Sequence, residues 1–127
     1  MKQPILSLRN SFLFLSIVFL LNLPGAVMAG SAAQIASQVE ILQDTNRSSQ
    51  ERSAAAQELG VVGLDSDATA HALVKIIEND SDPKVRASAA KALGMVGLPQ
   101  AAYIQTLIQT LQNDGSPEVR YAAAEGL

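Results

Sequence analysis

The chain has 127 residues, which suits one domain, and carries a formal net charge of −3. It contains no cysteine, so disulfide bonds, thiolate metal sites and cysteine nucleophiles are excluded. Residues 30–127 hold seven Lys or Arg side chains against twelve Asp or Glu side chains. This acidic balance argues against nucleic-acid binding, which needs a basic face.

The first part of the chain is expected to be a targeting sequence rather than part of the fold. Two basic residues precede an apolar run over 11–23, which is short for a membrane-spanning helix. Val27 and Ala29 then supply the small side chains typical of a signal-peptidase site. We therefore predict a signal peptide over 1–29, cleaved between Ala29 and Gly30, and export to a periplasmic, lumenal or secreted location. The alternative is an uncleaved N-terminal membrane anchor.

The rest of the sequence repeats at a fixed spacing. The segment NDSDPKVRASAAKAL begins at Asn79, and NDGSPEVRYAAAEGL begins at Asn113. Repetition at such a spacing indicates an array of stacked supersecondary units. Residues 30–127 are therefore expected to form one repeat domain. Its expected units are 32–63, 67–97 and 99–127, the last without a C-terminal stop.

Each unit is expected to contain two helices. The first helices are predicted over 32–43, 68–78 and 100–112. Asp67 is the predicted N-cap of the middle one. In the second helices, Asp82 and Ser116 are predicted N-caps, and a proline follows each at the first helical position. Gly60 and Gly94 are interpreted as left-handed C-terminal stops. No segment shows the alternation of a strand, so the predicted fold class is all-α.

The second helix of unit two indicates how the helices pack. Apolar residues recur along it at helical spacing, on one face: Val85, Ala89, Ala92, Leu93 and Val96. Helices of about 11 residues are marginal alone in water, so this face must be buried against a neighbour. The many alanines permit close approach of helix axes. We predict a short α-solenoid in which each unit contacts only its neighbours.

The segments ASAAKALGMVG and YAAAEGL, each preceded by D-x-x-P-x-V-R, resemble HEAT repeats. More narrowly, they resemble the HEAT-like repeats of the phycobilisome-lyase type, and the resemblance covers residues 32–127. It implies a right-handed α-solenoid that binds proteins along its surface. It also implies a ladder in which second-helix arginines meet acidic loop residues of neighbouring units. The ladder positions are Arg52, Arg86 and Arg120 with Asn46, Asp80 and Asp114.

Unit one departs from this pattern at two positions. Asn46 stands where the ladder has an acid, and Glu51 stands where the later units have valine. We therefore expect unit one to be a cap with one face in water.

Nothing in the sequence predicts catalysis. His71 is the only histidine, and we interpret it as an exposed helix residue. Metal-bearing members of the wider HEAT-like family use repeated His-Glu pairs, and this sequence has none. The glycine pairs lack the lysine of a phosphate loop, and His71 has no evident triad partner. We predict no catalytic residues, no cofactor and no metal.

The expected function is that of an exported, non-catalytic scaffold for protein partners. The first candidate surface is the groove lined by the second helices, with Lys84, Ser88, Lys91, Glu118, Tyr121 and Glu125. Tyr121 stands out because tyrosine is enriched in binding patches. Its alternative role is packing against unit two. The second candidate surface is the C-terminal face, through which the chain could self-associate.

Two other interpretations stay open. One is an enzyme resembling a chromophore lyase or a metal-dependent hydroxylase of HEAT type, because a fold does not fix a function. The other is a truncated remnant of a longer repeat array. Leu127 occupies the position of Leu93, and the sequence ends where the equivalent of Gly94 would stand.

Overall fold

A computed structural model describes residues 32–97 and 99–127, and the predicted signal peptide lies outside these residues. The described part contains six helices and no strand, which confirms the all-α prediction. The helices are α2 (Ala32–Gln43), α3 (Ser49–Val62), α4 (Asp67–Asn79), α5 (Pro83–Val96), α6 (Ala101–Asn113) and α7 (Pro117–Gly126). None of these six has the length and hydropathy needed to cross a membrane.

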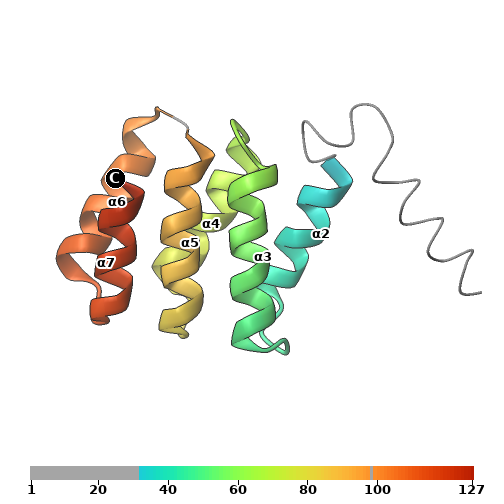
Figure 1. Cartoon of the computed structure of the whole chain (residues 1–127), viewed down its shortest axis with the longest axis horizontal. Coiled ribbons are helices and arrows are strands. Elements are labelled where there is room, and N and C mark those ends of the chain that lie inside the picture. Colours follow the sequence, from blue (N-terminus) through green and yellow to red (C-terminus); the bar gives the residue numbers. More distant parts are fainter. Residues whose placement is uncertain (1–31, 98) are drawn as a thin grey trace, which may run out of the picture. The chain divides into compact units, whose positions relative to one another are not determined.

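The helices are arranged as three stacked pairs in two layers (Figure 1). The second helices α3, α5 and α7 lie side by side in one layer, and each packs on the first helix of its own pair, α2, α4 or α6. The middle helix α5 contacts α3 on one side and α7 on the other. We call the pairs unit one (α2, α3), unit two (α4, α5) and unit three (α6, α7). Stacking of neighbouring helix pairs is the arrangement of an α-helical solenoid.

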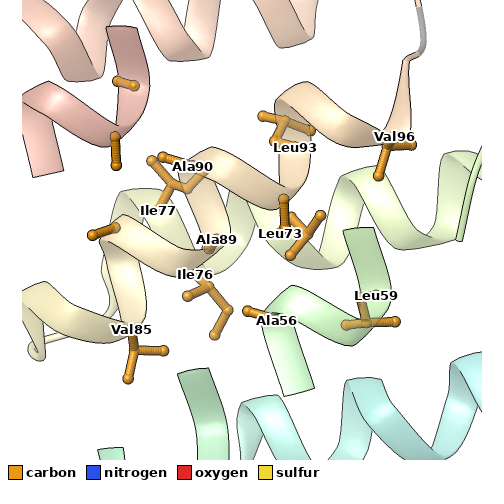
Figure 2. Close-up of a cluster of buried hydrophobic side chains, with 14 of the residues drawn as sticks. Ala56, Leu59, Leu73, Ile76, Ile77, Val85, Ala89, Ala90, Leu93 and Val96 are labelled. Carbon is orange, nitrogen blue, oxygen red and sulfur yellow. The ribbon is translucent and has the colours of Figure 1, made fainter. Parts of the chain in front are cut away.

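The core lies between the two layers and between successive units. The apolar face predicted for α5 is confirmed, because all of its residues are at most 4% exposed: Val85, Ala89, Ala92, Leu93 and Val96. Figure 2 shows side chains from α3, α4 and α5 meeting there, with Leu59, Leu73 and Leu93 among them. A single helix face therefore joins two units and two layers, which explains why short helices are stable in the array.

Local side-chain bonds fix where α3 and α5 begin. Ser48 and Glu51 form a capping box at α3, in which the Ser48 Oγ accepts from the Glu51 N–H at 3.2 Å and the Glu51 carboxylate accepts from the Ser48 N–H at 3.0 Å. The predicted cap of α5 is confirmed, since Asp82 Oδ1 accepts from the Lys84 N–H at 2.9 Å. Glu51, which stands where the later units have valine, therefore stabilises the start of its own helix.

The predicted cap of α4 is wrong, and the predicted N-cap position of α7 is confirmed without its side-chain bond. Ser66 caps α4, with its Oγ accepting from the Thr69 N–H at 3.2 Å, and Asp67 is the first residue of the helix. Ser116 stands at the N-cap position of α7, but its side chain makes no capping bond. Adjacent polar residues compete for a cap, and helix ends predicted from sequence are uncertain by one or two residues.

The prediction that Gly60 and Gly94 stop their helices is also wrong. Both glycines lie inside helices, and α3 and α5 continue beyond them to Val62 and Val96. The C-cap residues that follow the two helices are Gly63 and Gly97, and of these two only Gly97 adopts a left-handed conformation, with φ of 75°.

The helical glycines instead allow neighbouring second helices to approach closely. A Cβ atom on Gly94 would lie 2.4 Å from the Cα atom of Gly126 in α7. A Cβ atom on Gly60 would lie 3.0 Å from the Cα atom of Ala92 in α5. The α5–α7 contact therefore requires glycine at position 94, and the α3–α5 contact is less tight.

This difference predicts a graded effect of adding one methyl group. We expect Gly94→Ala to lower the free energy of unfolding by about 1–3 kcal/mol, because the new methyl group meets backbone atoms. The higher helix propensity of alanine, worth about 1 kcal/mol, opposes the clash without removing it. Urea unfolding followed by circular dichroism measures the change, and Gly60→Ala should lose less.

The matched control is Gly115→Ala in the loop before α7. A Cβ atom there would have no neighbour within 4 Å, so this variant should stay within about 0.5 kcal/mol of the parent. If Gly94→Ala unfolds at the same urea concentration as Gly115→Ala, the close α5–α7 contact is refuted.

Candidate functional site

A buried ion pair connects unit one to unit two. The guanidinium of Arg52 in α3 pairs with the carboxylate of Asp80, in the loop between α4 and α5. Both side chains are 6% exposed. The Nε atom of Arg52 also donates to the Leu42 carbonyl oxygen at 2.8 Å, so one guanidinium joins its own pair to the next. The Asp80 carboxylate further accepts from the Asp82 N–H at 2.9 Å, which fixes its position ahead of α5.

The same arrangement recurs one repeat later, between unit two and unit three. Arg86 donates through Nε to Asp114 Oδ2 and through Nη2 to Asp114 Oδ1, each at 3.0 Å. Such a two-pronged geometry suits the planar arginine fork. The Nη1 atom of Arg86 donates to the Asp80 carbonyl oxygen at 2.9 Å. Each arginine therefore contacts backbone of its own unit and a carboxylate of the following one.

Arg120 contacts the backbone of its own unit but pairs with no described carboxylate. Its Nη1 atom donates to the Asp114 carbonyl oxygen at 2.8 Å. Within the part of the chain that the structure describes, no carboxylate lies at ion-pair distance from Arg120. At the other end, Asn46 is exposed, and its backbone N–H donates to Asp44. No described helix precedes α2 to supply an arginine for the Asn46 position.

Hydrogen bonds lower the pKa of two carboxyl groups at the starts of the second helices, those of Asp114 and Asp82. Burial of Asp114 acts to raise the pKa of its carboxyl, but the opposing bonds from Arg86 and from the Ser116 N–H are stronger together, so the pKa is lowered. The hydroxyl of Ser49 donates to Asp82 and, with the Lys84 N–H, holds the pKa of the Asp82 carboxyl below its usual range. On the arginine side of the pair, the hydrogen bonds to Asp114 raise the pKa of the Arg86 guanidinium.

These shifts predict loss of stability in acid. A carboxyl whose pKa is lower in the folded state than in the unfolded state stabilises the fold at pH values above its unfolded pKa of about 4. This stabilisation is lost as the pH falls through the pKa of the folded state. We expect the urea midpoint of the parent chain to decrease between pH 5 and pH 2. Asp114→Asn should be less stable than the parent at pH 7 and should lose less on acidification. A variant with the same pH slope as the parent would contradict this role for Asp114.

The predicted partner-binding residues lie on the layer of second helices. The exposed members are Lys84, Lys91, Glu118, Tyr121 and Glu125, and Ser88 is half-buried. Lys91 and Glu125 join α5 to α7, with Nζ and Oε2 3.5 Å apart. Lys84 lies at the edge of a pocket of about 540 Å³ between α3 and α5, whose other lining residues are Ser48, Ser49, Gln50, Ser53, Ala54 and Gln57. The structure thus distributes the predicted residues over two helices rather than collecting them in one cleft.

Tyr121 is the most exposed of the large hydrophobic residues in the described part of the chain. It is 67% exposed, so its alternative role as a residue packed against unit two is wrong. An exposed tyrosine on a rigid helix offers contact area at small entropic cost.

Sequence reasoning missed a polar contact between the first helices. The Tyr103 hydroxyl donates to Asp67 Oδ1 at 3.2 Å, and the Gln100 side-chain amide donates to the same oxygen at 3.1 Å. Burial, followed by the bond to Asp67, raises the pKa of the Tyr103 hydroxyl. The ring of His71 meets Tyr103 edge to face, with centroids 5.9 Å apart, and His71 itself is exposed. These bonds join α4 to α6 and have no local sequence signal.

No cluster of three or more histidine, aspartate or glutamate side chains in the described ranges is arranged to hold a metal ion. The described surface instead carries charged side chains along α5 and α7. Beneath it, the arginine–aspartate ladder fixes how each unit is placed on the next.

Comparison with protein families agrees with this architecture. A family model described as HEAT repeats matches residues 35–127. Comparisons with curated proteins and with solved structures found no match. The family match spans all of α3 to α7 and most of α2. With its stacked helix pairs and its arginine ladder, the chain belongs to the HEAT repeat family.

Proposed function

We propose that this chain is an exported, non-catalytic, right-handed HEAT solenoid that binds a protein partner through its second helices. The observation that carries the proposal is the charge pattern on α5 and α7. Lys84 and Lys91 are seven residues apart on α5, and Glu118 and Glu125 occupy the equivalent positions on α7. Residues seven apart share a helix face, so a basic strip lies beside an acidic one.

A partner for this surface would present the opposite pattern. Acidic side chains would face α5, and basic side chains would face α7. Tyr121 would supply the aromatic anchor, since aromatic residues carry much of the binding energy in protein interfaces. The ion pair between Lys91 and Glu125 is exposed, and exposed pairs are weak, so a partner can replace it at small cost.

Affinity capture from the exporting compartment tests this interaction. The full chain should reproducibly enrich one protein, and Tyr121→Ala or Lys84→Glu should reduce the captured amount at least tenfold. Gln109→Ala is the matched control, because Gln109 is exposed on α6, outside the second-helix layer. Equal capture by all variants, or no enrichment above an unrelated HEAT solenoid, would refute binding through this surface.

Export is proposed from the sequence of residues 1–29. Fusion of this segment to a reporter that is active only outside the cytoplasm should give activity, and the recovered protein should begin at Gly30 by mass spectrometry. An intact N-terminus in the membrane fraction would favour an anchor. A cytoplasmic fusion would refute export.

The proposal of no catalysis rests on the sequence, in which His71 is the only histidine and has no evident triad partner. It is also supported by the described residues, among which no group of three or more histidine, aspartate or glutamate side chains could hold a metal ion. Metal analysis of the purified protein tests it. Stoichiometric iron or zinc, retained after dialysis, would instead favour a metal-dependent enzyme.

A further inference from the structure

The loop between α2 and α3 displays a three-residue pattern that the scaffold function does not use. Asn46, Arg47 and Ser48 form the sequence Asn-x-Ser with x other than proline, which is the acceptor pattern for N-linked glycosylation of exported proteins. All three residues are exposed. Because a glycan is bulky and hydrated, its acceptor must lie on the surface, and this loop meets that requirement.

Two hydrogen bonds hold Asn46 at the turn of this loop. The Asp44 Oδ1 atom accepts from the Asn46 N–H at 3.0 Å, and the Asp44 carbonyl oxygen accepts from the Arg47 N–H at 3.1 Å. An aspartate side chain that bonds a backbone N–H two residues on is a common turn-forming arrangement. Both bonds use backbone N–H groups, so neither occupies the side-chain amide of Asn46.

The position of Asn46 is suited to this role in unit one alone. In units two and three the same position holds Asp80 and Asp114, which pair with arginines of the preceding units. Unit one has no described helix before α2 that could supply such an arginine, and Asn46 is exposed. The departure from the ladder therefore places an amide at the surface where the other units bind a carboxylate.

A second copy of the pattern, Asn-Asp-Ser, begins at Asn79, but the fold restrains it. Asn79 is the last residue of α4, and its Nδ2 atom donates to the Lys75 carbonyl oxygen at 3.0 Å. The next residue, Asp80, is 6% exposed and pairs with Arg52. Presenting Asn79 to an enzyme would unwind a helix end and open the ladder between units one and two. The fold therefore favours Asn46 as the acceptor.

We propose that Asn46 is an N-glycosylation site, modified by an oligosaccharyltransferase of the exporting membrane. The side-chain amide nitrogen of Asn46 forms a bond to the anomeric carbon of an oligosaccharide carried on a lipid diphosphate. The bond between that carbon and the diphosphate oxygen breaks, the amide nitrogen loses one proton, and the lipid diphosphate leaves. This proposal rests on the proposed export of the chain and is independent of the partner-binding surface on α5 and α7.

The Ser48 hydroxyl belongs to the acceptor pattern and also caps α3. Its Oγ atom accepts from the Glu51 N–H at 3.2 Å and donates to the Glu51 carboxylate at 2.8 Å. These bonds lie in the first turn of a helix, where local opening is frequent, so an enzyme can reach the hydroxyl. The two roles can be separated, because aspartate is a good N-cap but has no hydroxyl.

The exported form of the full chain tests the site directly. Peptide mass spectrometry of protein that begins at Gly30 should find an oligosaccharide on Asn46 and none on Asn79. Asn46→Gln should lose the glycan, and Asn79→Gln should keep it. An exported chain with an unmodified Asn46 would overturn the proposal and leave export intact, whereas a chain retained in the cytoplasm would refute both.

The acceptor itself is tested apart from export, with the purified full chain, a purified oligosaccharyltransferase and a lipid-diphosphate oligosaccharide. The folded chain should be modified at Asn46 and not at Asn79. Ser48→Thr should keep the transfer, while Ser48→Asp should lose it with an unchanged urea midpoint, which separates the acceptor role from the cap. Transfer to Asn79 instead of Asn46, or equal transfer to the Ser48→Asp chain, would overturn the proposal.

Discussion

Replacing Asp80 by alanine is expected to lower the free energy of unfolding by about 3–5 kcal/mol, because it leaves a buried guanidinium without its carboxylate. The Arg52 side chain is 6% exposed and cannot turn to water without opening the contact between units one and two. The backbone bond from Asp82 to the Asp80 carboxylate is lost as well. Urea unfolding at pH 7 measures the loss.

Substitutions at the other two ladder positions, Asp114 and Asn46, are controls for Asp80→Ala. Asp114→Ala should cost less than Asp80→Ala, because Arg86 and Asp114 are 17% and 10% exposed and water can partly replace the missing partner. Asn46→Ala should stay within about 0.5 kcal/mol of the parent.

The double variant Arg52→Met, Asp80→Ala separates burial of a charge from loss of packing. It should recover part of the stability lost in Asp80→Ala, because an apolar side chain needs no ionic partner. If the double variant is no more stable than Asp80→Ala alone, an unpaired buried charge is not the cause of the loss.

The sequence predicted the helices and the buried face well because both depend on short-range patterns. The N-cap at Asp82, followed by proline, and the apolar spacing from Val85 to Val96 are properties of one helix, and tertiary packing did not change them. Repetition along the chain strengthened each pattern, since the same residues recur at the same positions of a second copy.

Apart from the N-cap of α4, which is displaced by one residue, the errors arise where a residue's partner lies far along the chain. A glycine that follows leucine near a helix end is typical of a stop, and only the position of Gly126, in the next unit, shows that Gly94 serves a helix contact. The bond from Tyr103 to Asp67 likewise joins two units. For the ladder, the resemblance to HEAT repeats implied the residues. The structure adds the direction of the ladder, since Arg52 and Arg86 each meet the aspartate of the following unit.

Leu93→Ala is expected to lower the free energy of unfolding by about 2–5 kcal/mol, and so to lower Tm by roughly 10 °C or more. Leu93 is 4% exposed in α5 and belongs to the core that joins α4 to the second helices (Figure 2). Truncation to alanine removes three carbon atoms and leaves a cavity that the surrounding helices fill only in part.

The repeat supplies matched comparisons for this substitution. Leu59, Leu93 and Leu127 occupy the same position in successive units and are 0%, 4% and 56% exposed. Leu59→Ala should therefore resemble Leu93→Ala, and Leu127→Ala should stay within about 0.5 kcal/mol of the parent. Since the three substitutions are chemically identical, any difference in Tm reports the stacking of the units. A Leu93→Ala chain that melts within a degree of the parent would show that α5 does not bury this face, and the stacked arrangement of the helix pairs would be refuted with it.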